Sequence, residues 1–512
     1  MNSANRRAGK EKMRFFWWRA LAASLLAMTF ASGAAAEWRR AESANFVLYS
    51  QSGDTKLREQ SALLEDYHLF LRALTGVTEP ASPNKLNVYM VRSEGQLRGI
   101  YDMPSGIDGV YVANSAGILA VVNETAAGGG QETLLHEVAH HFMKQYRPLP
   151  YPAWYMEGFA EYASTATFKK DVIEYGRPSV GRAYALVQGK WLPLDELLFA
   201  EVPSDRERMS AFYAQSWLLS HYLLRSPEMR PKFAAYLAAA AGGESPREAF
   251  ATGFATPVAE LERALRAYSK KPMSYTRFKR VSESARPAIA ITRLPPSADD
   301  LLLLRATMEV RPEAEPGLLA KVRAAASKHD DDFARRVLAQ AEALHGDPAR
   351  ADALLGPLLA ARPDDSELLY FKGMRHLRVA RDAADGESQY RLARTSFARA
   401  HKSNPDHWQT LLRYAEALRA DERFVSDNTI NILLLASELA PQTQEGTMNA
   451  AQLLIARKRW EEAERLLLPV TGDPHNRGLA EGARRLLEAA RARGRPVARS
   501  PEPAKDGAVA KE

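Results

Sequence analysis

Hydrophobic and polar positions in the first part of the chain alternate between the period of a strand and the period of a helix. Short apolar runs bounded by turn residues predict strands at 45–50, 85–91, 109–112 and 118–122. The last two runs flank a turn that begins at Asn114, which is the pattern of a hairpin. Apolar residues at helical spacing predict a helix over 57–74, followed by Gly76. Together these elements predict a small mixed sheet with one packed helix.

Helical spacing dominates from residue 131 onward. The pattern predicts helices at 131–146, 152–168, 210–225, 229–241 and 256–268. Gly128, Gly129 and Gly130 precede the first of these helices, but the Gly-Lys-Ser/Thr ending of a phosphate-binding loop is missing. A hinge or a lead-in to the helix is therefore the better interpretation of the glycines. Prolines then indicate a linker, at Pro287, Pro295 and Pro296.

A repeated pattern occupies the C-terminal half of the chain. Prolines that end helical segments recur about every 33 to 42 residues, at Pro363, Pro405, Pro441 and Pro474. Small and large residues surround the second of these prolines at the spacing of paired helices, namely Ala393, Phe397, Ala400, Trp408, Leu411 and Ala415. This pattern resembles tetratricopeptide repeats, whose period is 34 residues, with an insertion near 382–388. The resemblance implies three to four units; a generic helical bundle is the alternative.

The length of the chain and its lack of cysteine narrow the function. At roughly 100–200 residues per domain, 512 residues predict two to four domains. We expect a catalytic domain, a linker with a helical connector, a repeat domain and a disordered tail, at 37–280, 281–331, 332–493 and 494–512. A mean hydropathy of −0.34 argues against a protein with many membrane spans. Without cysteine, any metal ion must be held by histidines and carboxylates.

The net charge of +7 is concentrated at the N-terminus. Residues 1–36 carry a net +5, so the rest of the chain carries +2, and nucleic acid is not an expected partner. The basic stretch leads to an apolar run and then to Ala34-x-Ala36, the order of a secretory signal cleaved before Glu37. This order predicts export to a periplasm or to the exterior. The alternative is an uncleaved segment that anchors the protein in the inner membrane, the one case in which we expect membrane contact.

The strongest chemical motif is His136-Glu137-Val138-Ala139-His140, which matches HExxH. Residues four apart lie on one face of a helix, so both imidazoles can reach one metal ion. The intervening Glu137 then lies near a metal-bound water and can accept its proton. A second helix, which opens after Pro152, carries Glu157 as a third donor. Two histidines and one glutamate leave the fourth tetrahedral position open, as in catalytic zinc sites.

These motifs, with the segment AFYAQSWLLSHYLL at 211–224, resemble the gluzincin metallopeptidases and in particular the bacterial peptidase MA-like proteins. The resemblance covers about 45–268 and implies an α+β catalytic domain that binds one Zn²⁺ per chain. It implies the zinc ligands His136, His140 and Glu157, with Glu137 as the general base. Glu161 matches a carboxylate that orients a ligand histidine. No substrate-amine motif of the aminopeptidase type is present, so endopeptidase activity is the better prediction.

An oxyanion donor is expected from the segment near 213. Tyr213 and His221 are the candidates; Tyr213 is preferred because its surrounding pattern resembles similar proteins, and a packing role is the alternative. Strand 109–112 or strand 118–122 could pair with an extended peptide substrate, or could simply form the sheet edge.

Two functional hypotheses follow from the sequence. The first is an exported zinc-dependent peptidase, in which the α+β domain hydrolyses peptide bonds and the all-α repeats bind a protein substrate or partner. The second is a catalytically inactive adaptor that uses the repeats alone. A zinc hydrolase that cleaves another kind of bond is a third alternative, because a metal site does not name the bond it cleaves. The intact set of His136, Glu137, His140 and Glu157 favours the peptidase.

Overall fold

The structure is a computed structural model. It describes residues 37–103, 106–126, 130–280, 287–311, 316–382, 386–419, 424–474 and 476–494. The predicted signal segment lies outside these ranges, as do Gly128, Gly129, the tail beyond Gly494, and parts of the predicted linker and insertion. Within the described ranges, no helix combines the length and the apolar character that a membrane span requires.

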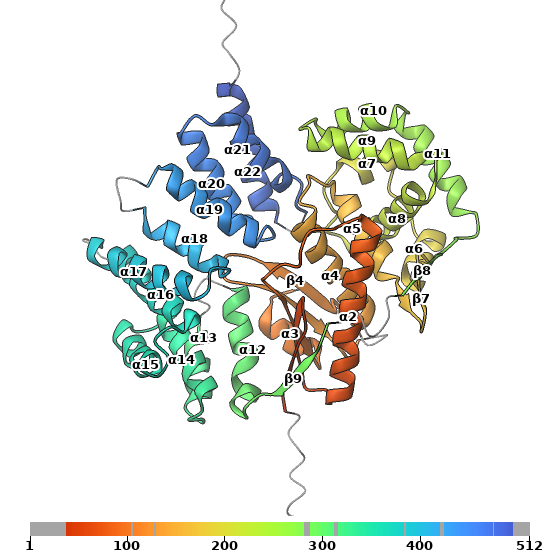
Figure 1. Cartoon of the computed structure of the whole chain (residues 1–512). Helices are drawn as coiled ribbons and strands as arrows, with labels where there is room; N and C mark the ends of the chain where they lie inside the picture. The colour runs from red at the N-terminus through yellow and green to blue at the C-terminus, as the bar shows by residue number, and fades with distance from the viewer. Residues whose placement is uncertain are drawn as a thin grey trace, which may run out of the picture.

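A six-stranded mixed sheet forms the centre of the N-terminal part (Figure 1). Its order is β4-β5-β3-β2-β1-β9. The strands are β1 Arg39–Glu42, β2 Phe46–Ser50, β3 Leu86–Val91, β4 Gly109–Ala113, β5 Ile118–Asn123 and β9 Ala290–Arg293. The inner strands β2, β3 and β5 run parallel, and both edges of the sheet are antiparallel. The predicted mixed sheet and its β4–β5 hairpin are therefore confirmed.

The two faces of the sheet are covered by different parts of the chain. Val88 and Val122 belong to the larger core, with helices α2 (Asp54–Thr75) and α4 (Gln131–Tyr146). Their neighbours along the strands belong to a second core, together with α3 (Glu94–Ile100) and α12 (Ser297–Val310). Successive side chains of a strand point to opposite faces, which explains why these runs are apolar throughout.

Helices continue from residue 153, and the first of them packs beside α4. They are α5 Ala153–Ser164, α6 Val180–Gln188, α7 Leu194–Phe199, α8 Arg206–Arg225, α9 Met229–Ala241, α10 Pro246–Phe254 and α11 Val258–Ser269. A small second sheet joins β6 Thr167–Phe168, β7 Val172–Tyr175 and β8 Thr276–Lys279. The prediction of one helix over 152–168 is thus wrong at its end. Thr167 and Phe168 instead form a short strand that pairs with β7, because β-branched and aromatic residues favour strands.

Gly158 allows α5 to approach α8 closely. A Cβ atom at this position would collide with the backbone carbonyl of Ser216 and the hydroxyl of Ser220. Both serines lie on α8, so the close approach that Gly158 permits is made to α8.

The C-terminal half is a succession of helices, each packed on the next. After α12 they are α13 Leu318–Ala326, α14 Asp332–His345, α15 Pro348–Ala361, α16 Ser366–Asp382, α17 Glu387–Ser403, α18 Trp408–Ala417, α19 Asp427–Leu439, α20 Glu445–Ala456, α21 Trp460–Leu467 and α22 Arg477–Gly494. The predicted small and large seam residues, including Ala393, Phe397 and Trp408, are buried. The predicted helical repeat region is confirmed at this level.

The described residues of segment 281–331 form helices and one strand. The segment contributes β9 to the central sheet, and α12 packs both on that sheet and on the following helices. Helices α12–α22 are called the helical array below, and Figure 1 shows this array along one side of the N-terminal part. Polar contacts join the two parts: Asn114 Nδ2 donates to the Val310 carbonyl over 2.9 Å, and Lys144 forms an ion pair with Asp473 over 2.7 Å.

Candidate metal centre

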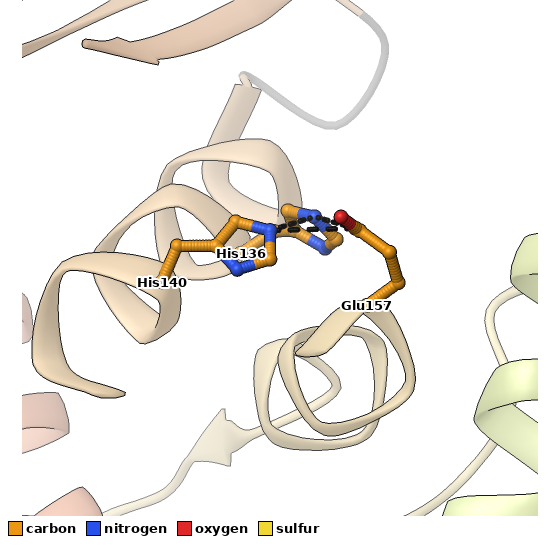
Figure 2. Close-up of side chains that lie close together, drawn as sticks. All are labelled: His136, His140 and Glu157. Atoms are coloured by element: carbon orange, nitrogen blue, oxygen red, sulfur yellow. Dashed lines mark hydrogen bonds and ion pairs between the residues drawn. The ribbon is translucent and has the colours of Figure 1, made fainter. Parts of the chain in front are cut away.

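Helix α4 is built to hold two histidines at a helix–helix junction. Gly130 begins it with a φ of 68°, where a side chain would collide with the carbonyl of Asn123. The apolar residues of α4 are buried in the core, which fixes the helix, namely Leu134, Leu135, Val138, Ala139 and Phe142. His136 and His140, one turn apart, then project toward α5 (Figure 2).

Three donor atoms converge between α4 and α5 (Figure 2). The two Nε2 atoms of His136 and His140 lie 3.0 Å apart. Glu157 Oε2 lies 3.3 Å from the first and 3.4 Å from the second. A tetrahedral zinc ion with bonds of about 2.0–2.1 Å separates its ligand atoms by roughly 3.3–3.4 Å. The spacing and the chemistry of this donor set therefore fit zinc.

The centre is buried but not sealed. The side chains of His140 and Glu157 are 1% and 2% exposed, whereas His136 is 15% exposed. A carboxylate taken this far from water is costly unless it is paired with positive charge. Because His136 is the most exposed of the three side chains, solvent reaches the cluster on the side of His136.

The electrostatics of the cluster favour a cation. Burial by itself lowers the pKa of His136, but its hydrogen bond with Glu157 and the charges of Glu161, Glu137 and Glu157 raise that pKa to about 9. The same three carboxylates would attract a divalent metal ion at this point.

Glu161 lies behind His136, the first histidine of the HExxH motif. Its Oε1 is 3.4 Å from His136 Nδ1, the ring nitrogen that faces away from the donor cluster. Arg182, on α6, donates to both oxygens of Glu161, from Nε over 2.7 Å and from Nη2 over 2.6 Å. Sequence reasoning missed Arg182, because α6 was not predicted and no motif marks it.

Glu137 and Tyr213 lie near the cluster. The charge of Glu137 contributes to the raised pKa values of both His136 and Tyr213. The ring of Tyr213, on α8, lies 6.3 Å from the ring of His136. The charge of Glu157, together with burial, raises the pKa of Tyr213 above its usual range. Its hydroxyl therefore stays protonated and can donate a hydrogen bond.

His221 does not belong to the cluster. Its Nε2 lies 2.9 Å from the Ser274 carbonyl and its Nδ1 lies 2.8 Å from the Tyr268 hydroxyl. Burial lowers its pKa to about 4, so it is a neutral core histidine. His221 is therefore not placed to act as an oxyanion donor, and Tyr213 is the candidate that remains.

The predicted substrate strands also differ from each other. Strand β5 pairs with β3 and β4 on its two sides, so its backbone groups cannot bind an extended peptide. Strand β4 is the edge of the sheet and packs against α4. Of the two, β4 alone retains an edge that could pair with a substrate.

Comparison with known proteins adds little to this picture. No known protein family and no curated protein matches the chain. Among solved structures, a thermophilic TPR protein of Thermus thermophilus is similar at 20% identity and a TM-score of 0.32, over 38% of this chain and 99% of that one. The chemistry of the centre must therefore be inferred from its own residues.

Proposed function

We propose that this chain is an exported zinc-dependent peptidase, most simply an endopeptidase. The observation that carries the proposal is the convergence of His136 Nε2, His140 Nε2 and Glu157 Oε2 within 3.0–3.4 Å of one another. Export follows from the predicted signal segment, with a periplasmic or secreted protein as the result. An inactive adaptor would not need to keep three donors and a neighbouring carboxylate together in its interior.

In this proposal, His136, His140 and Glu157 hold one zinc ion. A bound zinc ion supplies Lewis-acid polarisation of the scissile carbonyl and lowers the pKa of water. Glu137 takes the proton of the attacking water and delivers it to the nitrogen of the leaving amine. The hydroxyl of Tyr213 donates a hydrogen bond to the carbonyl oxygen of the substrate, on which negative charge develops. Glu161 holds the ring of His136 from behind.

The helical array is proposed to bind a protein, as substrate or as partner. A polar groove of about 530 Å³ lies between the array and the N-terminal part. Residues from α12, α16 and α18 line it, including Arg305, Glu367 and Trp408, and residues 115–118 of the β4–β5 turn close one side. The groove is thus lined by both parts of the chain.

The test compares the wild type with Glu137→Gln in the same preparation. Bound zinc is measured by mass spectrometry of the metal, and hydrolysis with a mixture of unstructured peptides. We expect one zinc per chain in both proteins and a loss of hydrolysis of about 10²–10⁴-fold in the variant.

Glu260→Gln is the matched control, because Glu260 is an exposed glutamate on α11. It should leave zinc content and hydrolysis unchanged. Wild-type protein that binds zinc but cleaves no peptide would favour the adaptor or a hydrolase of another bond.

A further inference from the structure

Arg182 reaches the candidate metal centre from a peripheral helix. Helix α6 has no buried residue; Val180, Tyr184 and Val187 point outward with exposures of 89%, 70% and 76%. Arg182 differs from these neighbours, because only 27% of its side chain is exposed. The helix therefore lies on the surface, where Leu186 packs against the core and Arg182 extends toward the candidate metal centre.

The contact between Arg182 and Glu161 is a two-pronged ion pair. The Nε and Nη2 atoms donate to different carboxylate oxygens, over 2.7 and 2.6 Å. A planar guanidinium bound in this way fixes the rotation of the carboxylate as well as its position. Lysine could supply the charge but not this geometry.

The fixed carboxylate faces the first metal-site histidine. Glu161 Oε1, the oxygen that accepts from Nη2, lies 3.4 Å from His136 Nδ1. A carboxylate in this position holds the orientation and the tautomer of a ligand histidine. A continuous path thus runs from Arg182 through Glu161 and His136 to the donor atoms.

Arg182 makes a second contact with the site. Its guanidinium carbon lies 4.9 Å from the centre of the Tyr213 ring, a cation–π arrangement. Tyr213 in turn lies beside His136, with ring centroids 6.3 Å apart. One side chain therefore contacts both the carboxylate behind His136 and the tyrosine beside it.

We infer that Arg182 is a positioning residue, which orients His136 for metal binding through Glu161 and holds Tyr213 through its ring. This inference rests on the proposed zinc site and adds a residue that the HExxH pattern does not contain. The competing explanation is that the ion pair only attaches α6 to the protein. Zinc affinity separates the two explanations, because attachment of α6 would affect stability alone.

The first experiment measures zinc affinity by competition with a chelator, and thermal unfolding of the metal-free proteins. We expect Arg182→Met to weaken zinc binding about tenfold, the lower end of the effect of losing a partner behind a ligand. Arg182→Lys should also weaken zinc binding, since it keeps the charge without the fork. Arg247→Met is the matched control, because Arg247 makes the same kind of double contact with Asp195 on the surface. It should leave zinc affinity unchanged.

A double-mutant cycle tests the path itself. Glu161→Gln should weaken zinc binding by about 10–100-fold. Adding Arg182→Met to that variant should then change zinc affinity little, because the arginine acts on the metal site through Glu161. An Arg182→Met protein with wild-type zinc affinity would overturn the inference, and so would an undiminished effect in the Glu161→Gln background.

The outcomes also separate this inference from the proposed function. Wild-type protein that binds zinc without cleaving peptides contradicts the peptidase, while the affinities still decide the role of Arg182. Wild-type protein that binds no zinc contradicts both. Normal zinc binding and hydrolysis in Arg182→Met and Arg182→Lys contradict only the inference.

Discussion

The candidate metal centre and the seams of the helical array are filled by different kinds of side chains. At the α4–α5 junction, ionisable side chains lie in the interior within hydrogen-bonding distance, among them His140, Glu157 and Glu161. In the array, the seams are filled by apolar and small residues such as Ala393, Phe397 and Ala400. Buried ionisable groups cost stability, whereas buried apolar groups supply it. The difference agrees with the proposed function, in which the first region binds a metal ion and the second packs helices.

The largest effect is expected from removing one of the three candidate zinc ligands. His140→Ala should lower zinc affinity by more than a hundredfold, beyond the range for residues that act from behind a ligand, and should abolish hydrolysis. Chelator competition and peptide cleavage measure the two effects. A His140→Ala protein that retains zinc affinity and activity would show that His140 is not a zinc ligand.

The corresponding change in the array is Phe397→Ala. Phe397 is fully buried, and its ring packs against Gly373, where a Cβ atom would collide with it. We expect a loss of about 3–5 kcal/mol in the free energy of unfolding, measured by urea denaturation. Zinc affinity measured without denaturant should not change, and a parallel loss of zinc binding would show that the array and the centre are one cooperative unit.

A smaller effect is expected from Gly158→Ala. The added methyl group would meet Ser216 and Ser220 on α8, which should cost about 1–3 kcal/mol of stability and displace α5. Because Glu157 is the adjacent residue, zinc affinity should fall as well. Gly356→Ala is a suitable control, since a Cβ atom on Gly356 meets nothing within 4 Å. Unchanged zinc binding in Gly158→Ala would show that zinc affinity does not depend on the close packing of α5 against α8.

The last effect appears only on acidification and concerns a buried histidine away from the donor set. Burial, with a contribution from Arg72, lowers the pKa of His68 from 6.5 to about 4. Between these values the unfolded chain binds a proton that the folded protein does not, so stability falls as the pH falls. The slope from this one group is about 1.4 kcal/mol per pH unit.

Unfolding free energies measured between pH 6.5 and 4 check this expectation. His68→Gln should show a shallower dependence on pH than the wild type. An identical slope in the two proteins would mean that His68 is protonated in the folded state or titrates normally there.

The elements with strong local patterns were predictable from the sequence. The helix at 131–146 and the strands near 46, 86, 109 and 118 have the expected positions, because periodicity and turn residues define them locally. His136 and His140 could be paired for the same reason, since four residues of helix fix their relative placement. Glu157 required one further step, a short turn between two helices.

Other parts depend on contacts that no local pattern encodes. Arg182 lies 21 residues from Glu161, on a short surface helix whose residues Val180 and Tyr184 are exposed although apolar. Strand β9 is only four residues long and mostly exposed, and it is a strand because β1 offers an unpaired edge. Helix α12 has apolar residues on more than one side because it covers the sheet and also begins the array. Tertiary packing decides these three elements.

We propose above all that α4 and α5 together bind one zinc ion that serves peptide hydrolysis. Calorimetric titration of zinc into the metal-free wild-type chain, followed by a cleavage assay of the same sample, tests it most directly. We expect one tight site per chain and peptide hydrolysis that appears in proportion to the zinc bound. No tight binding, or full occupancy without hydrolysis of any peptide, would contradict it.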